Sequence, residues 1–337
     1  MRWALLSLFF APVVAAAADD SACAACHARE ASRFRPTPMA QALQTLNRCD
    51  ILKTHPDLSF QEGPYHTRIT REGDRSIITV TSGAESFSVP ILYALGQGKA
   101  GQTYVFQYDG AIYESRASFY NETGGLDLTI GDQGTAPHTM VEAAGRRMGP
   151  GEAANCFGCH SNGAVAGGIL HLESVVPGVG CRSCHLQADK HAAAVRAGNV
   201  AAAKMPHLAD LAAEETLELC GQCHRTWAQI ARAGMHGPNT VRFQPYRLTN
   251  SKCYDVEDQR LRCTTCHDPH GQINTNLASY DAKCGACHST ALHTKVCSVA
   301  KENCVTCHMP KIDLPGAHHK FTDHQIRIVK AGAPYPN

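Results

Sequence analysis

The stretch Cys263-Thr264-Thr265-Cys266-His267 places two cysteines three positions apart, with a histidine directly after the second. Two thiols at this spacing can add to the two vinyl groups on one edge of a porphyrin, and the adjacent imidazole can then ligate the iron. This pentapeptide therefore has the form of a c-type haem attachment motif.

The same Cys-x-x-Cys-His pattern occurs seven times and accounts for 14 of the 17 cysteines. Disulfides and zinc sites are the alternatives, but neither requires a histidine after the second cysteine in every copy. We therefore predict seven covalently attached haem c groups, each with a proximal histidine. The motifs are Cys23/Cys26/His27, Cys156/Cys159/His160, Cys181/Cys184/His185, Cys220/Cys223/His224, Cys263/Cys266/His267, Cys284/Cys287/His288 and Cys304/Cys307/His308.

Each six-coordinate iron needs a second axial ligand, and twelve histidines lie outside the motifs. Those in the motif-rich part of the chain are favoured over His55, His66 and His138, which lie in a stretch without motifs. Methionine is the other usual ligand and raises the reduction potential of its haem. The candidate distal ligands are His171, His191, His207, His236, His270, His293, His319, His324 and Met39.

The first residues have the features of a secretory signal peptide. Arg2 precedes an apolar run, Trp3–Ala18, that is too short to span a membrane and ends in small residues. Cleavage after Ala18 would leave 319 residues (337 minus 18). We expect an exported protein without a transmembrane segment after cleavage, most simply periplasmic, with an extracellular or cell-surface location as the alternative.

The motifs divide the remaining chain into a first haem segment (19–50), a haem-free insert (51–150) and a hexahaem domain (151–337). The insert alternates polar and apolar residues, which predicts β-structure. Its clearest hairpin joins Tyr104–Tyr108 to Ala111–Ser115 through Asp109-Gly110. The predicted fold is an α-helical and irregular multihaem cytochrome with a β-rich insert, having a haem-packed core with little regular secondary structure.

Three cysteines stand outside the motifs: Cys49, Cys253 and Cys297. An oxidising compartment would allow two of them to pair, and we predict a disulfide between Cys253 and Cys297, both inside the hexahaem domain. Cys49 is then either a reactive thiol or, more commonly for a lone cysteine, a buried inert one.

The chain resembles exported multihaem c-type cytochromes related to the tetrahaem electron carriers of ammonia oxidisers, including relatives fused to tetratricopeptide repeats. The resemblance extends over most of the mature chain and implies bis-histidine haems in closely packed pairs. It is carried by Pro177–Cys181 through His191, Cys263–His270, Cys304–Lys311, Phe321–His324, Gln244–Leu248 with Ser251–Cys253, and Gly101–Tyr104 through Gly124–Thr129.

Two departures from the family pattern matter. Such proteins often carry a histidine about a dozen residues after the first motif, where this chain has Thr37-Pro38-Met39-Ala40. Met39 would then replace a histidine ligand and raise the potential of one haem, unless the ligand comes from elsewhere. No tetratricopeptide array follows the last motif.

Composition limits the function further. Lys+Arg number 31 and Asp+Glu 30, with no basic run, which argues against nucleic-acid binding. Haem propionates would make the loaded protein negative, which favours redox partners with basic faces, such as a membrane quinol-oxidising cytochrome or other multihaem cytochromes.

The leading hypothesis for the function is electron transfer through a chain of mostly bis-histidine haems rather than catalysis. The first alternative is a multihaem reductase or oxidase acting on a small nitrogen or sulfur species at one open iron. The second alternative is a subunit of an extracellular conductive filament. The β-rich insert, which is aromatic and free of haem motifs, is a candidate docking or assembly module.

Overall fold

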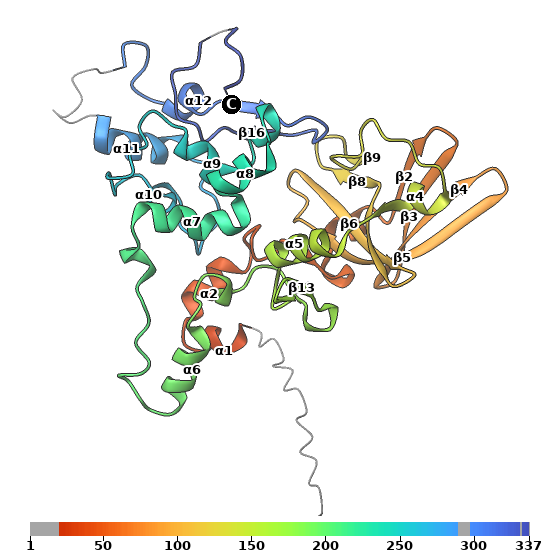
Figure 1. The fold of residues 1–337 in the computed structure, drawn as a ribbon, viewed down its shortest axis with the longest axis horizontal. Coiled ribbons are helices and arrows are strands. Elements are labelled where there is room, and N and C mark those ends of the chain that lie inside the picture. The colour runs from red at the N-terminus through yellow and green to blue at the C-terminus, as the bar shows by residue number, and fades with distance from the viewer. Residues whose placement is uncertain (1–19, 289–296, 331, 337) are drawn as a thin grey trace, which may run out of the picture.

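The structure is a computed structural model that describes residues 20–288, 297–330 and 332–336. An antiparallel β-sheet forms one side of the molecule, and the helices that carry most of the cysteine motifs form the other (Figure 1). The predicted signal peptide, residues 1–18, lies outside the described residues.

Ten strands form the main sheet, in the order β10-β7-β6-β5-β4-β3-β2, with β1 paired to β5 and β8 paired to both β6 and β9. Every pairing is antiparallel. The strands are β1 (Leu43–Gln44), β2 (Asp57–Glu62), β3 (Tyr65–Glu72), β4 (Arg75–Ser82), β5 (Glu85–Leu95), β6 (Gly101–Tyr108), β7 (Ala111–Ser115), β8 (Ala117–Tyr120), β9 (Gly125–Leu128) and β10 (Gly145–Arg147).

The predicted hairpin between β6 and β7 is confirmed. Tyr108 pairs with Ala111, and Asp109 and Gly110 form the turn with φ of 46° and 70°. Two consecutive residues with positive φ form the kind of turn whose twist matches that of antiparallel strands, and an Asp-Gly pair tolerates this backbone.

The prediction of a haem-packed core with little regular secondary structure is wrong. The sheet has an apolar core of its own, in which Ile69, Ile78, Val80 and Phe106 are almost completely buried. The alternation of apolar residues continues over successive strands, so one face of the sheet forms a core of packed side chains. The sequence prediction treated this part only as an insert in an otherwise irregular fold.

The helical side is also more regular than predicted, and four of its helices include a complete motif up to its histidine. These are α5 (Pro150–His160), α7 (Ala213–His224), α11 (Leu277–His288) and α12 (Cys304–His308). The other helices are α1 (Ser21–Ala24), α2 (Ala28–Phe34), α3 (Asp50–Thr54), α4 (Met140–Ala144), α6 (Ala188–Arg196), α8 (Trp227–Ala233), α9 (Gln244–Thr249) and α10 (Cys263–Cys266).

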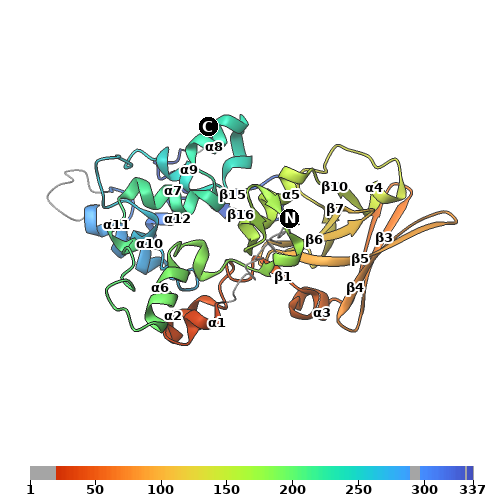
Figure 2. The ribbon, with the colours of Figure 1, turned by 60° about the horizontal axis from the view of Figure 1, so that its bottom comes forward.

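Figures 1 and 2 show how these helices group around the motifs. In both views α1, α2 and α6 lie together at one end, and α7, α9, α10, α11 and α12 form a second group beside them. Helix α5 lies between the helical side and the sheet. Three short strand pairs complete the fold: β11 (Ser161–Asn162) with β14 (Val176–Pro177), β12 (Val165–Ala166) with β13 (Ile169–Leu170), and β15 (Lys311–Asp313) with β16 (Lys320–Thr322).

Candidate haem-binding sites

The helices explain how a motif can present three groups to one porphyrin. In α7 the residues Cys220, Cys223 and His224 occupy positions i, i+3 and i+4. Residues at these positions share one face of an α-helix, so both thiols and the imidazole project from the same side of the helix. The motifs in α5, α11 and α12 have the same placement.

The two cysteines of a motif differ in their exposure. The first cysteine of each of the seven motifs is half-buried, whereas the second is exposed in five of them: Cys26, Cys184, Cys223, Cys266 and Cys307. Sγ of Cys307 lies 3.8 Å from the hydroxyl oxygen of the neighbouring Thr306. Haem attachment at the motif cysteines stays a prediction.

Three motif histidines also have a hydrogen-bond partner at Nδ1. His160 lies 2.8 Å from the carbonyl oxygen of Ala42, and His308 lies 2.9 Å from that of Arg327. His224 lies 3.1 Å from Oε1 of Gln244. When Nδ1 carries the donated proton, Nε2 keeps its lone pair for a metal, which is the usual arrangement of a ligating histidine. Burial lowers the pKa of His160 and His224, which favours the neutral ring that a metal requires.

Among the residues that the structure describes, three motif histidines face a second histidine at a distance that fits an iron between them. The ring centroids are 6.2 Å apart for His27 and His191, 6.0 Å for His185 and His270, and 6.2 Å for His267 and His324. A metal–nitrogen bond of about 2 Å on each side, plus about 1 Å from nitrogen to ring centre, gives about 6 Å. These rings are therefore spaced as two axial ligands of one metal would be.

The second histidine of each pair is held by local contacts. Nδ1 of His191 lies 2.5 Å from the Ala203 carbonyl oxygen, and Nδ1 of His324 lies 3.0 Å from that of Thr322. Burial lowers the pKa of His324 to about 4, so its ring is neutral at physiological pH. The amide of His270 donates to Asp268, which forms an ion pair with Arg33.

Motif cysteines that are distant in the sequence lie next to one another. The Cys159 and Cys223 thiols interact directly, and so do Cys220 with Cys263 and Cys284 with Cys304. Their effects on each other's pKa concern the unmodified polypeptide, because thioether bonds would remove these protons. What carries over to the haem-loaded protein is the proximity of the attachment points.

The first and third motifs are adjacent in the same way. Asp20, Cys23 and Cys181 have ligand atoms within 4.8 Å of one another, which would also suit a small metal ion. Asp20 is, however, already bound to the Cys181 amide at 2.7 Å and to Arg182 at 3.0 Å, and both thiols belong to haem motifs. We therefore interpret this cluster as the junction of two haem sites.

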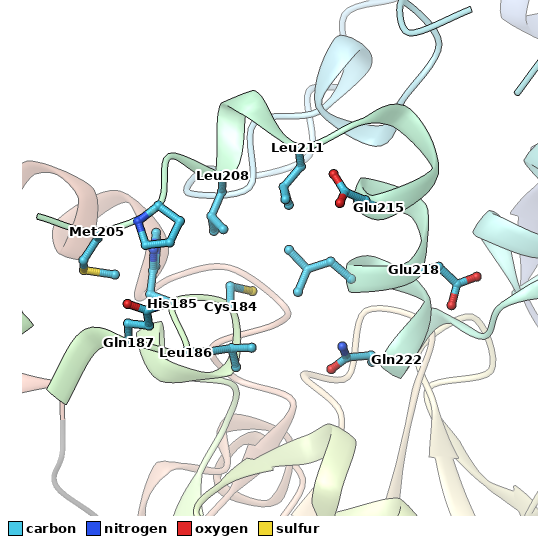
Figure 3. A pocket seen from close by; sticks show the side chains of 12 residues that line it. Cys184, His185, Leu186, Gln187, Met205, Leu208, Leu211, Glu215, Glu218 and Gln222 are labelled. Carbon is cyan, nitrogen blue, oxygen red and sulfur yellow. The ribbon is translucent and has the colours of Figure 1, made fainter. Parts of the chain in front are cut away.

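A cavity of about 370 Å³ lies beside the third motif. Its lining shows whether the surroundings of this motif suit a porphyrin. Cys184 and His185 line it together with apolar side chains that include Met205, Leu208 and Leu211 (Figure 3). Its size and lining are typical of a site for a large apolar ligand. The cavity thus brings one thiol and the imidazole of the third motif against an apolar wall, whereas Cys181, the other thiol of the motif, does not line it.

The remaining candidate distal ligands are not brought against a motif histidine by any of these ring pairs. His171 contacts Glu173 at 3.3 Å, and His319 contacts Glu122 at 2.8 Å on the sheet side. His207 and His236 are exposed, each just before a short 3₁₀ helix. His293 lies outside the described residues.

Met39 lies where two motifs meet. Its carbonyl oxygen accepts a hydrogen bond from Val179 at 3.0 Å, and Gly178 donates to the His160 carbonyl at 3.1 Å. Gly178 has φ of +86°, and a Cβ there would lie 1.9 Å from the Ala40 carbonyl oxygen, so only glycine allows this close approach. The half-buried Met39 therefore stays a candidate ligand near the second and third motifs.

The predicted disulfide between Cys253 and Cys297 does not form, and both are exposed free thiols. Cys253 lies near Cys287 of the sixth motif, whereas the backbone at Val299 and Ala300 hydrogen-bonds Cys297 and lowers its pKa. The two side chains thus have different surroundings. Cys49 is fully buried and donates to Oε1 of Gln102 at 2.9 Å, in agreement with an inert thiol.

Several residues of these sites were not predicted from the sequence. The carbonyl groups of Ala42 and Arg327 carry no side-chain signal, since any residue could supply them. Gln244 and Asp268 stood within stretches noted for family resemblance, but their partners depend on the folded chain. The described residues contain no helix long and apolar enough to cross a membrane.

Comparison with known proteins adds one finding. Residues 133–186 match the family model of cytochrome c554 and c-prime, a region that contains the second and third motifs. The match supports a relationship to c-type cytochromes, which implies covalently bound haem c and a role in electron transfer. No curated protein and no solved structure matches the chain.

Proposed function

We propose that the chain is an exported heptahaem c-type cytochrome that passes electrons between redox partners through mostly bis-histidine haems. The observation that carries this proposal is the set of three histidine pairs, each combining a motif histidine with a distant one at about 6 Å. When bound, each haem supplies a one-electron iron couple. The polypeptide supplies the two ligands, their orientation and the burial that tunes the potential.

The contacts between cysteines support an order for the seven sites. Cys23 lies next to Cys181, and Cys220 lies close enough to Cys184 to contribute, after burial, to its raised pKa. The first, third and fourth motifs are therefore neighbours in that order. Cys220 contacts Cys263, which places the fifth motif next to the fourth. Cys284 of the sixth motif lies near Cys266 of the fifth and contacts Cys304 of the seventh, so these three motifs follow in order. The second motif joins at the fourth, through Cys159 and Cys223.

This order gives a path with one branch. Its ends are the first motif, in the α1 and α2 group, and the seventh, in α12 (Figure 1). The branch ends at the second motif in α5, next to the sheet. We propose that the sheet serves as a docking face for a redox partner at this branch, and that the protein acts in the periplasm or at the cell surface.

An electron count tests the proposal. The oxidised protein is titrated with dithionite under anaerobic conditions while the haem absorbance is followed, and is then mixed with an oxidised soluble cytochrome. The proposal predicts uptake of seven electrons per chain and their return to the acceptor. Uptake of fewer electrons than there are motifs, or a reduced protein that passes none on, would contradict it.

The alternative of a multihaem reductase or oxidase rests on the second motif. None of the ring pairs formed by the described residues joins His160 to another histidine. Burial and, to a lesser extent, the nearby carboxylates of Glu114 and Glu152 raise the pKa of Cys156 to about 11. An open iron beside groups that exchange protons would suit catalysis. Binding of nitrite or hydroxylamine to one haem of the resting protein would favour this alternative.

A further inference from the structure

A buried ion pair joins two stretches that the sequence analysis singled out for family resemblance. Arg247 in α9 and Asp323, directly after β16, have fully buried side chains. Nε of Arg247 donates to Oδ1 of Asp323 at 2.9 Å, and Nη2 donates to Oδ2 at 3.0 Å. This two-point contact fixes both the distance and the relative orientation of the groups.

Further contacts satisfy the remaining polar atoms of the pair. Arg327 donates to Oδ2 of Asp323 at 2.5 Å, and the amide of Gln325 donates to Oδ1 at 3.1 Å. Arg247 also donates to the Pro336 carbonyl at 2.9 Å, and its guanidinium lies 4.5 Å from the centre of the Tyr335 ring. Because burial of two charges is costly, such a network is better suited to fixing one conformation than to adding stability.

The conformation that the network fixes is that of His324, the residue after Asp323. Ser251 donates to the His324 carbonyl at 3.1 Å and accepts from the Ile326 amide at 2.8 Å. Ser251 follows shortly after α9, the helix of Arg247. Both sides of His324 are therefore anchored to the same part of the chain, and its ring faces His267 at 6.2 Å.

We propose that Arg247 and Asp323 are positioning residues that hold His324 as the distal ligand of the haem attached at Cys263 and Cys266. This inference rests on the proposed function, because it requires a haem at that motif. It assigns a role to the Gln244–Leu248 and Phe321–His324 stretches, which the motifs alone leave unexplained.

The test uses the full haem-loaded protein with Asp323→Asn, which keeps the shape of the side chain and removes its charge. The expected result is that one haem in seven leaves the low-spin population in electron paramagnetic resonance and binds carbon monoxide, and that added imidazole restores it. Asp258→Asn is the matched control, because Asp258 forms an exposed ion pair with Arg260 at 2.6 Å close to the same motif. The control should keep all haems low-spin.

Two further variants separate the possible outcomes. His324→Ala should produce the same change in one haem; if it changes none, the ligand assignment in the proposed function fails. If His324→Ala changes one haem and Asp323→Asn changes none, the positioning role is overturned while the ligand assignment stands. If Asp323→Asn does not fold, Arg247→Lys decides, since it keeps the charge and loses the forked contact. An Arg247→Lys protein with all haems low-spin would overturn the inference.

Discussion

The imidazole rings of His185 and His270 lie parallel, with 2° between their planes and 6.0 Å between their centroids. Parallel rings at this centroid separation are compatible with offset stacking. Parallel planes at this separation suit two ligands on opposite faces of one porphyrin. The fold thus brings a motif histidine and a distant histidine to a spacing at which one iron could lie between them.

Replacing His270 with alanine should remove one axial ligand from the site of Cys181, Cys184 and His185. The haem count should stay the same, because the thioether bonds do not depend on the distal ligand. One iron in seven should become high-spin and bind carbon monoxide, as measured by electron paramagnetic resonance and absorbance. His66→Ala is the control, since His66 is exposed on β3. A His270→Ala spectrum identical to the control would exclude this pair as a ligand set.

Alkylation of cysteines should distinguish the three free thiols from the 14 motif thiols. Cys253 and Cys297 are exposed and Cys49 is buried. Iodoacetamide should therefore label two cysteines in the native haem-loaded protein and three after denaturation, as counted by mass spectrometry. No labelling before denaturation would point to a Cys253–Cys297 disulfide. Because Cys26 and Cys307 are exposed, labels on them would mean that the first or last motif carries no haem.

The sequence allowed some parts of the fold to be predicted and not others. The β6–β7 hairpin was predictable because the Asp109-Gly110 turn and the alternation beside it are local signals. The extent of the sheet was underestimated, since its core depends on contacts between strands far apart, such as β1 with β5.

The candidate sites show the same limit. The motif residues follow directly from their spacing, whereas the choice of His191 for His27 depends on how α6 packs near α2. The buried pair of Arg247 and Asp323 joins residues 76 positions apart, and no sequence period connects them. The prediction of a Cys253–Cys297 disulfide failed for the same reason, namely that contacts between distant residues depend on the fold. An oxidising compartment permits a disulfide, but only the fold can bring two thiols together.

Phe106→Ala should test the apolar core of the sheet. Phe106 is completely buried and stacks on Tyr113, with 5.1 Å between the ring centroids. Removal of a buried phenylalanine ring costs about 3–5 kcal/mol of unfolding free energy, measured here by far-ultraviolet circular dichroism on heating. Ile169→Ala, at a side chain that is 64% exposed, should change it by about 0.5 kcal/mol or less. Equal effects of the two variants would contradict the observed packing.

Two glutamates that share Arg146 should respond to pH in opposite ways. Burial raises the pKa of Glu114, although Arg146 donates to it at 2.7 Å, whereas the hydrogen bond from Arg146 lowers the pKa of Glu152. The stabilising contribution of Glu114 is therefore full below its unfolded pKa and is lost as pH rises through the higher folded value. That of Glu152 is full above its unfolded pKa and is lost as pH falls through the lower folded value.

Urea unfolding between about pH 3 and pH 7 tests this contrast, because the change linked to Glu152 falls below its unfolded pKa of about 4.5. Relative to the parent protein, Glu114→Gln should gain unfolding free energy as pH rises, and Glu152→Gln should lose it. The two variants serve as controls for each other, since both remove one carboxylate from the same arginine. Parallel pH profiles for the two would contradict the assigned shifts.

Low-temperature electron paramagnetic resonance of the fully oxidised protein, quantified against its iron content, tests the central claim most directly. We predict seven irons per chain, essentially all low-spin, with no change in the signals or the optical spectrum on addition of nitrite, hydroxylamine or carbon monoxide. A high-spin component that shifts with added ligand would contradict this claim, because it would reveal the open iron that the reductase or oxidase alternative requires.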